Sequence, residues 1–252
     1  MILSWYRQNT KDFGILRATS LLLRVVSRRA IVNARNTLLP TRVECPCCGW
    51  VGNRFLDYKE MGYSIRNIEC PQCGSHSRHR AFFLWLRNDY QIADKSGTAL
   101  VFAPERALAS LWATAQGLQT FGIDIEPTRD VDVLADVMRL PFGADAANII
   151  WCHHVLEQVT DDHQAMTELR RVLKPETGQL ILSAGLSGEL STREFGRSEK
   201  GLSGNRRSYG ADIAERLAKA GLVVNQVSFG LAAEAMTKYA ISDEPFYVCR
   251  KS

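Results

Sequence analysis

Short apolar runs alternate with amphipathic stretches from residue 98 to the end of the chain. Such runs are typical of buried strands, and seven occur, at 98–102, 118–124, 131–136, 148–153, 179–184, 222–229 and 245–250. Helices are predicted between them, over 106–116, over 165–173, where apolar residues recur at helical spacing before Lys174-Pro175, and over 210–220. Strands that alternate with helices predict an α/β fold with a mostly parallel, doubly wound sheet.

Residues 1–43 are predicted to form a basic amphipathic helical segment, because apolar and basic positions recur there at roughly helical spacing. Residues 1–44 hold eight Arg and Lys against two acids, whereas the remainder holds 23 of the 31 basic and 25 of the 27 acidic residues. Affinity for anions is therefore expected mainly in this segment. Its partner is left open between the rest of the domain, a second subunit, an anionic membrane surface and nucleic acid, and an Arg-rich targeting peptide has the same composition.

No transmembrane span is expected from the sequence. The most apolar early run, 21–26, is interrupted by Arg24 and is far shorter than a bilayer requires. It also lacks the clean apolar core of a signal peptide. Four of the seven cysteines lie in Cys-x-x-Cys pairs, a pattern that favours metal binding over disulfides. We therefore expect a cytoplasmic protein, with peripheral membrane contact through the N-terminal helix left open.

The motif Cys-Pro-x-Cys-Gly occurs twice, at 45–49 and at 70–74. Its glycine tolerates the positive φ of a tight turn, and the backbone amides of such a turn can face the thiolates. Cys47 is the spare thiol, because only the outer cysteines of the first motif match the spacing of the second. A redox dithiol would not need a second matched pair. The motifs predict a four-cysteine structural zinc site with the ligands Cys45, Cys48, Cys70 and Cys73.

Basic residues follow the second motif directly, as Arg78-His79-Arg80, and the apolar run at 81–86 predicts a helix. Arginines beside free helix N–H groups make a good anion site, so Arg80 is a candidate contact for a negatively charged ligand. The alternative is a solvated helix start, or arginines that pair with acids of the zinc module itself. Strands of that module are expected at 50–56 and 63–69.

Between residues 136 and 184, six segments occur in a fixed order: Asp136-Val137, Leu140-Pro-Phe142, Asn148–His154, Val155-Leu-Glu157, Glu168–Pro175 and Gln179–Ala184. Together they resemble the back half of a class I S-adenosylmethionine (SAM)-dependent methyltransferase, of the type 11-like group. A subgroup of these enzymes looks similar from about Cys45 onward, with the paired cysteine motifs, the Arg-His-Arg, an Ala-Pro-Glu turn and a late Tyr-Gly. The resemblance implies a Rossmann-like seven-stranded methyltransferase sheet in a domain at 77–252, preceded by a zinc ribbon at 44–76 and an N-terminal helix at 1–43.

This resemblance implies a SAM site outside the carboxyl ends of the strands. Asp124 is implied to accept hydrogen bonds from the ribose, and Asp136, with the Val137 amide beside it, to face the adenine. The usual glycine-rich loop is replaced by Ala103-Pro104-Glu105, in which the proline has no N–H. Glu105 would repel the methionine carboxylate but can pair with the ammonium group. The implied cofactor-binding set is Ala103, Glu105, Asp124, Ile125, Asp136, Val137 and His153.

Methyl transfer from a sulfonium needs mainly alignment of the acceptor, and a general base when the acceptor is a hydroxyl. His154 is the candidate base, with lining of the cofactor pocket as the alternative role. The candidate substrate mouth, with a preference for anions, consists of Arg80, Arg206, Arg207 and Tyr209. Two departures from the family pattern, Ala147-Asn148 for Phe-Asp and Gln158 for a frequent His, leave the fold plausible and leave room for reduced activity.

Three functions are consistent with the sequence. We expect a SAM-dependent methyltransferase that acts on a small molecule or a glycan-type intermediate. The first alternative is an RNA or protein methyltransferase that holds its substrate with the zinc ribbon, but seven basic and five acidic residues over 45–97 are a weak footprint for nucleic acid. The second is a non-catalytic scaffold with a degenerate SAM site, for which Ala103-Pro104-Glu105 is the main support.

Overall fold

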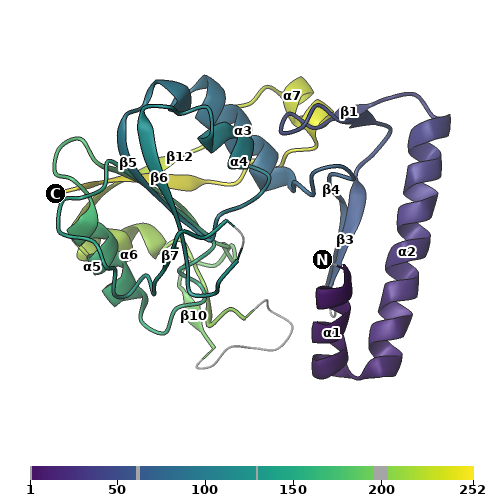
Figure 1. The fold of residues 1–252 in the computed structure, drawn as a ribbon, viewed down its shortest axis with the longest axis horizontal. Helices are drawn as coiled ribbons and strands as arrows, with labels where there is room; N and C mark the ends of the chain where they lie inside the picture. Colours follow the sequence, from purple (N-terminus) through teal and green to yellow (C-terminus); the bar gives the residue numbers. More distant parts are fainter. Residues whose placement is uncertain (1, 61–62, 129, 196–203) are drawn as a thin grey trace. The chain divides into compact units, whose positions relative to one another are not determined.

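The computed structural model describes residues 2–60, 63–128, 130–195 and 204–252, and it divides the chain into two compact units (Figure 1). The first unit comprises Met1–Phe83 together with Leu231–Ser242. The second comprises Leu84–Gly230 together with Asp243–Ser252. Helix α3, Ser77–Asn88, begins in the first unit and ends in the second. No helix within the described residues is long and apolar enough to cross a membrane.

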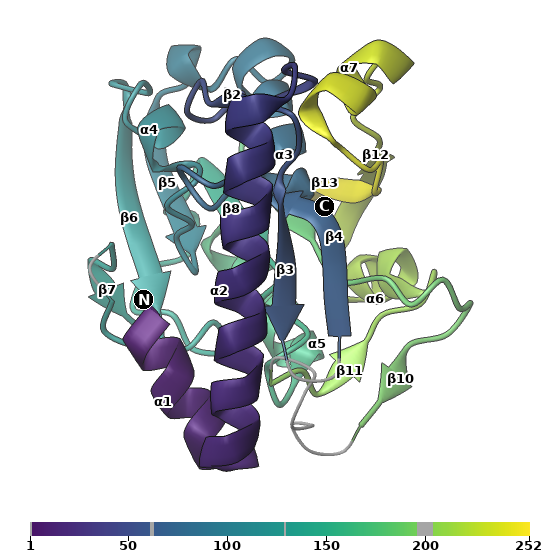
Figure 2. The same cartoon turned by 90° about the vertical axis from the view of Figure 1, so that its right-hand side faces the viewer.

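Two helices open the first unit, where the sequence predicted one amphipathic segment. They are α1, Ile2–Phe13, and α2, Ile15–Leu38, and the chain turns between them at Gly14, whose φ is 84°. Glycine adopts this left-handed conformation without the steric cost that a Cβ would impose. α2 contacts α1 and runs beside strand β3 (Figure 2). One side of α2 is therefore packed within its own unit, where Ala18 and Val32 are buried.

Two antiparallel hairpins follow the helices. The first pairs β1, Val43–Glu44, with β2, Val51–Gly52, and the second pairs β3, Leu56–Glu60, with β4, Tyr63–Glu69. The strand expected over 50–56 is interrupted, because its backbone N–H groups bond to side chains instead of a ladder. Those of Asn53 and Arg54 donate to Asn36 Oδ1, and that of Phe55 donates to Asn67 Oδ1.

A segment near the end of the chain, Leu231–Ser242, also belongs to the first unit. The sequence did not predict this assignment. The segment contains α7, Ala233–Tyr239, and is held by contacts with residues far away in the chain. Lys238 Nζ lies 2.7 Å from a carboxylate oxygen of Glu44, and the backbone N–H of Ser242 donates to Ser77 Oγ. The first unit, which contains the paired cysteine motifs, therefore completes its fold with residues from near the C-terminus.

The second unit is built on a seven-stranded sheet with the order β12-β13-β9-β8-β5-β6-β7. Only β13 runs antiparallel to its neighbours. The strands are β5, Gly97–Phe102; β6, Leu118–Asp124; β7, Val133–Leu134; β8, Ile149–His153; β9, Gln179–Ser183; β12, Leu222–Val227; and β13, Phe246–Lys251. This is the expected Rossmann-like methyltransferase sheet, although β7 is much shorter than the predicted run at 131–136.

The helices of this unit are α4, Ala109–Trp112; α5, Asp162–Val172; and α6, Ile213–Lys219; the short 3-10 helix η1, Ile92–Asp94, precedes β5. α5 begins where Asp161 accepts the backbone N–H of Gln164, and it buries the apolar stripe that predicted it. α4 covers only one turn of the helix expected over 106–116. A further two-residue hairpin pairs β10, Arg193–Glu194, with β11, Arg207–Ser208.

The order of the strands creates one special place in the sheet. From β5 the chain proceeds to β6 and β7 on one side, and then to β8 and β9 on the other. The carboxyl ends of β5 and β8 therefore adjoin at a topological switch point, where open α/β sheets bind their ligands. Ala103 follows β5 at this edge, and His154 follows β8.

Candidate functional site

A cavity of about 290 Å³ lies at the carboxyl ends of β5, β6 and β8. This volume is at the lower end of the range of small-molecule sites. Its walls are mainly apolar, with a few polar side chains among them. The lining residues are Phe102, Ala103, Ile123, Asp124, Ile125, Ala135, Asp136, Val137, Met138, His154, Val155, Gln158, Val159, Thr160 and Arg206.

The turn after β5 takes the place of the usual glycine-rich loop without using glycine. Ala103 has a φ of 47°, a left-handed conformation that is uncommon for a residue with a side chain. Its backbone N–H donates to the Ile123 carbonyl, which ties the turn to β6. Ala103 thus adopts the conformation that a glycine would supply, and its small side chain lines the cavity.

Two predicted carboxylates line the same cavity. Asp124 ends β6, and its Oδ1 accepts the backbone N–H of Glu126. The Oδ1 of Asp136 accepts the backbone N–H of Met138. Each carboxylate is oriented by one local bond, and within the described part of the chain no hydrogen bond engages its second oxygen, which suits bonding to ligand hydroxyls or amines. Val137 and Ile125 complete this wall.

Glu105 and His153 were also predicted to touch the cofactor, but neither lines the cavity. Glu105 Oε2 lies 2.7 Å from His153 Nδ1, so the two side chains bond to each other across the switch point. The His153 side chain is 2% exposed and that of Glu105 is 18% exposed. The Glu105 carboxylate, expected to repel the methionine carboxylate of SAM and able to pair with its ammonium group, is thus bonded to an imidazole.

His154 lines the cavity and is held from behind by a buried carboxylate. Its Nδ1 lies 2.8 Å from Glu157 Oε1, which also accepts the Gly185 N–H at 2.7 Å. Glu157 is 1% exposed, whereas the His154 side chain is 32% exposed. Because an ionised carboxylate only accepts hydrogen bonds, the proton lies on Nδ1 and the lone pair of neutral His154 is on Nε2.

Burial by itself opposes ionisation of Glu157. The hydrogen bonds from His154 and from the Gly185 amide outweigh this effect and hold the pKa of Glu157 below its usual value. His154 also has a φ of 54°, so a second strained residue stands at the switch point beside Ala103.

The structure gives Arg207 and Tyr209 a different position from the predicted substrate mouth. Arg207 is 3% exposed and donates to the carbonyls of Leu156 and Val159, and Tyr209 is fully buried. These donors support the segment that carries the cavity wall, so their polar groups are directed into the protein. Neither Arg207 nor Tyr209 presents an exposed polar group to a substrate, in contrast to the predicted role. Arg206, the preceding residue, does line the cavity.

Asp162, at the start of α5, is the centre of this supporting network. It accepts the Tyr209 hydroxyl at 2.8 Å and the Arg216 guanidinium at 2.8 and 2.9 Å. Burial by itself raises the pKa of Asp162. The hydrogen bonds from Arg216 and Tyr209 outweigh this effect and hold the pKa below its usual value. α5, α6 and the β11 segment are thereby joined behind the cavity.

Arg80 likewise has an interior position, within the first unit. It is fully buried, its guanidinium carbon lies 3.9 Å from the centroid of the Phe55 ring, and its pKa is lowered by that burial. Four hydrogen bonds use its N–H groups, to the carbonyls of Ile68, Ser75, Tyr239 and Ala240. Arg80 therefore ties α7 to the second cysteine motif, in place of the anion contact that we expected.

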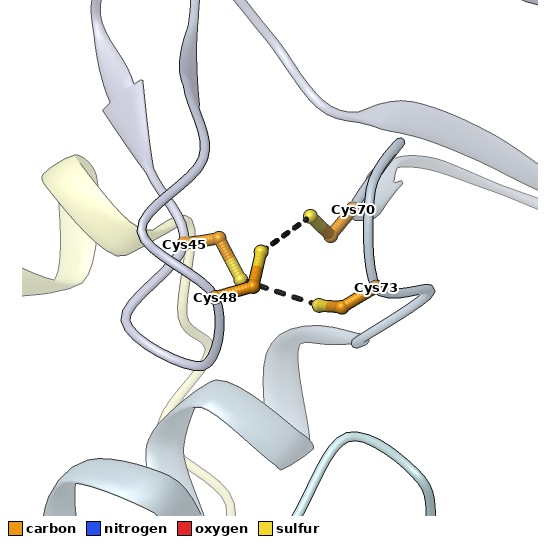
Figure 3. A group of neighbouring side chains, drawn as sticks. All are labelled: Cys45, Cys48, Cys70 and Cys73. Atoms are coloured by element: carbon orange, nitrogen blue, oxygen red, sulfur yellow. Dashed lines mark hydrogen bonds between the residues drawn. The ribbon is translucent and has the colours of Figure 1, made fainter. Parts of the chain in front are cut away.

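The four predicted zinc ligands converge on one point (Figure 3). All four sulfur atoms lie within 4.8 Å of one another, with 3.6 Å between Cys45 and Cys73 and 3.7 Å between Cys48 and Cys70. Four thiolates at about 2.3 Å from a tetrahedral zinc stand about 3.8 Å apart, so the arrangement fits that ion. In each motif the glycine, Gly49 or Gly74, has positive φ and donates its N–H to the first cysteine carbonyl.

The cysteines perturb one another strongly. Hydrogen bonds from the Cys47, Cys70 and Cys73 thiols lower the pKa of Cys45, and the pKa of Cys70 is raised because its thiol donates to Cys45 and because it is buried. Ionisation of all four requires a central cation.

Sequence reasoning missed the role of Glu157, Met138 and Thr160 in this site. Glu157 was used only as part of the family-like Val-Leu-Glu segment, although the spacing His154-x-x-Glu157 places the two side chains within reach across a tight turn. Asn148, noted as a departure from the family, has a structural part: its Oδ1 accepts from the Thr98 N–H and from Lys174 Nζ, both at 3.0 Å.

Comparison with known proteins agrees with this geometry. Residues 104–182 match the model of a family described as a methyltransferase domain. The match lies within the second unit, whose seven-stranded sheet has the Rossmann-like fold of class I, SAM-dependent methyltransferases. No curated protein matches the chain in sequence.

Solved structures with a similar chain trace include three examples. The cyclase SpnF is 20% identical, with 69% of this chain and 81% of that one covered and a TM-score of 0.48. A SAM-dependent methyltransferase from Aquifex aeolicus is 16% identical, with 69% and 97% covered and a TM-score of 0.45. One from Methanosarcina mazei is 13% identical, with 64% and 95% covered and a TM-score of 0.43.

Proposed function

We propose that the protein is a SAM-dependent methyltransferase that acts on a small, anionic or glycan-type acceptor. The observation that carries the proposal is the cavity at the switch point of a methyltransferase domain, which Asp124, Asp136 and His154 line together. The carboxylates fit the ribose and adenine of SAM in the roles that the family resemblance implies, and the base stands in the same cavity.

The same geometry weakens the scaffold alternative. Its main support was the altered Ala103-Pro104-Glu105 turn, in which Glu105 was expected to repel the methionine carboxylate although it can pair with the ammonium group. Because Glu105 bonds to His153 and Ala103 adopts the glycine-like conformation, the turn keeps its backbone against the cavity. The replacement of the glycine-rich loop by Ala103-Pro104-Glu105 is therefore compatible with a cofactor site in this cavity.

The chemistry proposed for this cavity is direct methyl transfer. SAM, when bound, supplies a methyl group on a sulfonium whose bonding electron pair stays with sulfur as the methyl leaves. His154 accepts the proton of the acceptor hydroxyl on Nε2 as the new carbon–oxygen bond forms. Glu157 holds the Nδ1–H and, as a buried anion, stabilises the positive charge that develops on the imidazole.

The acceptor class follows from the other lining residues. Gln158, Thr160 and Arg206 supply hydrogen-bonding groups and one positive charge to a cavity of small-molecule size. The weak basic excess over 45–97 argues against a nucleic-acid substrate. We therefore favour a hydroxyl on a small acceptor that carries a negative charge.

Calorimetric titration with SAM and with its demethylated product tests the cofactor assignment. We expect micromolar binding of both ligands, and loss of binding in Asp124→Ala. Asp89→Ala, which removes an exposed acid of the same unit, is the matched control and should bind as the wild type does. Absence of binding in the wild-type protein would refute the proposal and restore the scaffold alternative.

We also propose that the four-cysteine cluster binds structural zinc. The chain provides its own control, because Cys47 lies in the same motif but outside the four converging sulfurs. Cys70→Ser should lower zinc affinity by more than about a hundredfold, since loss of outer partners alone costs about 10–100-fold. Cys47→Ser should retain one zinc per chain. Equal zinc content in both variants, measured by atomic emission after dialysis, would contradict this ligand set.

A further inference from the structure

Helix α2 has a second apolar side that its own unit does not cover. Ala18 and Val32 are buried on its packed side, and α2 contacts α1 and β3; near its start the Thr19 hydroxyl also bonds to the Tyr6 hydroxyl of α1. On the other side, Leu16 is 84% and Leu38 is 81% exposed. Three further exposed residues complete what we call the α2 stripe, which consists of Leu16, Leu23, Val26, Ile31 and Leu38.

The stripe is continuous along the helix. At 100° per residue, its five members fall within a sector of about 140° over a helix about 36 Å long. Three hydroxyl groups in the same sector bond to carbonyls of their own helix: Thr19 Oγ1 donates to Ile15, Ser27 Oγ to Arg24 and Thr37 Oγ1 to Ala34. Such bonds leave mainly carbon atoms on the surface.

A row of arginines follows one edge of the stripe. Arg17, Arg24, Arg28 and Arg35 are all exposed and fall within about 40° of one another around the helix axis. Arg28 lies 3.6 Å from Asp57, beside β3. The sequence from Phe13 to Val43 contains no acidic residue, so α2 itself supplies nothing to neutralise the row.

This combination selects one kind of partner. A second copy of the chain packed on the stripe would bring two arginine rows to one apolar contact, with no acid on either helix to offset them. A nucleic acid would neutralise the arginines but leave the leucines in water. An anionic bilayer satisfies both features, because its acyl region accepts the apolar side chains while long arginine side chains reach its headgroups.

We propose that α2 docks the protein on anionic membrane surfaces, with the α2 stripe inserted at the boundary of the acyl chains and the arginine row on the headgroups. The inference goes beyond methyl transfer and does not depend on it. It places the protein at a membrane surface whether or not the second unit binds SAM.

Flotation of the full-length, zinc-loaded protein with lipid vesicles tests the proposal without cofactor or acceptor. We expect binding to vesicles of equal parts phosphatidylcholine and phosphatidylglycerol, little binding to phosphatidylcholine alone, and weakening as salt is raised. Equal binding to both compositions, or binding to neither, would overturn it.

Two pairs of variants separate the apolar and charged contributions. Leu16→Ser with Leu38→Ser should weaken binding at least about tenfold, since each substitution removes an apolar side chain from the acyl region. Leu190→Ser is the control, because Leu190 is also 84% exposed but lies in the second unit. Arg17→Gln with Arg35→Gln should weaken binding about 30-fold, at about fivefold per arginine.

The matched charge control is Arg87→Gln with Arg250→Gln, which removes two exposed arginines outside α2. It should leave vesicle binding within about twofold, well under the effect of one membrane-facing arginine. Unchanged circular dichroism and zinc content establish that each variant is folded. A dimer in light scattering that Leu16→Ser with Leu38→Ser dissolves, or RNA binding in preference to vesicles, would replace the membrane with that partner.

Discussion

Individual residues at the switch point are strained in a way that serves the cavity. Ala103 and His154 both have positive φ, and they follow the two adjacent strands β5 and β8. The positive φ turns the chain at Ala103 and at His154 so that these residues line the cavity. An extended continuation of either strand would not bring them there. Strain of this kind persists only where the surrounding structure enforces it, which supports a functional role for both residues.

Replacing Ala103 with glycine should not destabilise the protein. The left-handed conformation costs alanine about 1–2 kcal/mol, which exceeds the glycine entropy cost of about 0.5–1 kcal/mol. We expect Ala103→Gly to raise the free energy of unfolding by up to about 1 kcal/mol in denaturant titration. Ala218→Gly, within α6, should instead lower it by about 1 kcal/mol. A loss in both variants would show that Ala103 is not strained.

The His154–Glu157 pair predicts a defined tautomer. Long-range proton–nitrogen spectra should show the hydrogen of neutral His154 on Nδ1 in the wild type and in Glu157→Gln, whose amide oxygen still accepts. Glu157→Leu should lose this preference and keep SAM affinity. With an acceptor, turnover should fall about a hundredfold in His154→Ala. A tautomer that Glu157→Leu leaves unchanged would exclude Glu157 as the positioning residue.

At the scale of elements, buried polar networks decide how helices meet the sheet. Asp162 joins the start of α5 to Arg216 of α6 and to Tyr209 after β11. The sequence predicted both helices from their apolar spacing, but it gave no sign that Arg207 and Tyr209 point inward. Their polarity favoured a surface role, and only packing shows that each has partners inside the domain.

This network predicts loss of stability in acid. The pKa of Asp162 is lowered in the folded state, so its stabilising contribution is complete above its usual pKa of 3.8 and disappears as the pH falls through the lowered value. Asp162→Asn should lose about 3 kcal/mol at pH 7 and depend less on pH below about 4. Urea titrations at several pH values measure both effects. If Asp162→Asn kept the pH dependence of the wild type, other carboxylates would be its cause. The control is Glu189→Gln, which changes a carboxylate at an exposed site.

At the scale of the whole molecule, the two units share the chain in an interleaved way. Leu231–Ser242 leaves the methyltransferase sheet between β12 and β13 to complete the first unit. The predicted domain boundaries at 43 and 76 divide the chain into consecutive segments. Such a division cannot assign a late segment, Leu231–Ser242, to the first unit. Arg80 helps to hold this segment in place, together with the Lys238–Glu44 ion pair and the Ser242–Ser77 hydrogen bond.

Removing Arg80 should therefore destabilise the first unit. Arg80→Ala removes four hydrogen bonds to backbone carbonyls, one of them buried and three part-buried, and we expect a loss of about 3 kcal/mol or more in thermal unfolding. Arg87→Ala, on the exposed end of the same helix, should have little effect. SAM binding should persist in Arg80→Ala at low temperature. Unchanged stability would contradict the structural role and return Arg80 to the predicted anion contact.

The sequence alone determined the alternation of strands and helices, the four-cysteine motif and the acids at the strand ends. These features depend on local periodicity and on spacing within short segments, which the chain carries directly. Tertiary structure alone decided that Glu105 bonds to His153, that Glu157 supports His154, and that Arg80, Arg207 and Tyr209 are interior. The physical reason is that a polar side chain is assigned by its partners, and those partners come from strands and loops far apart in the chain.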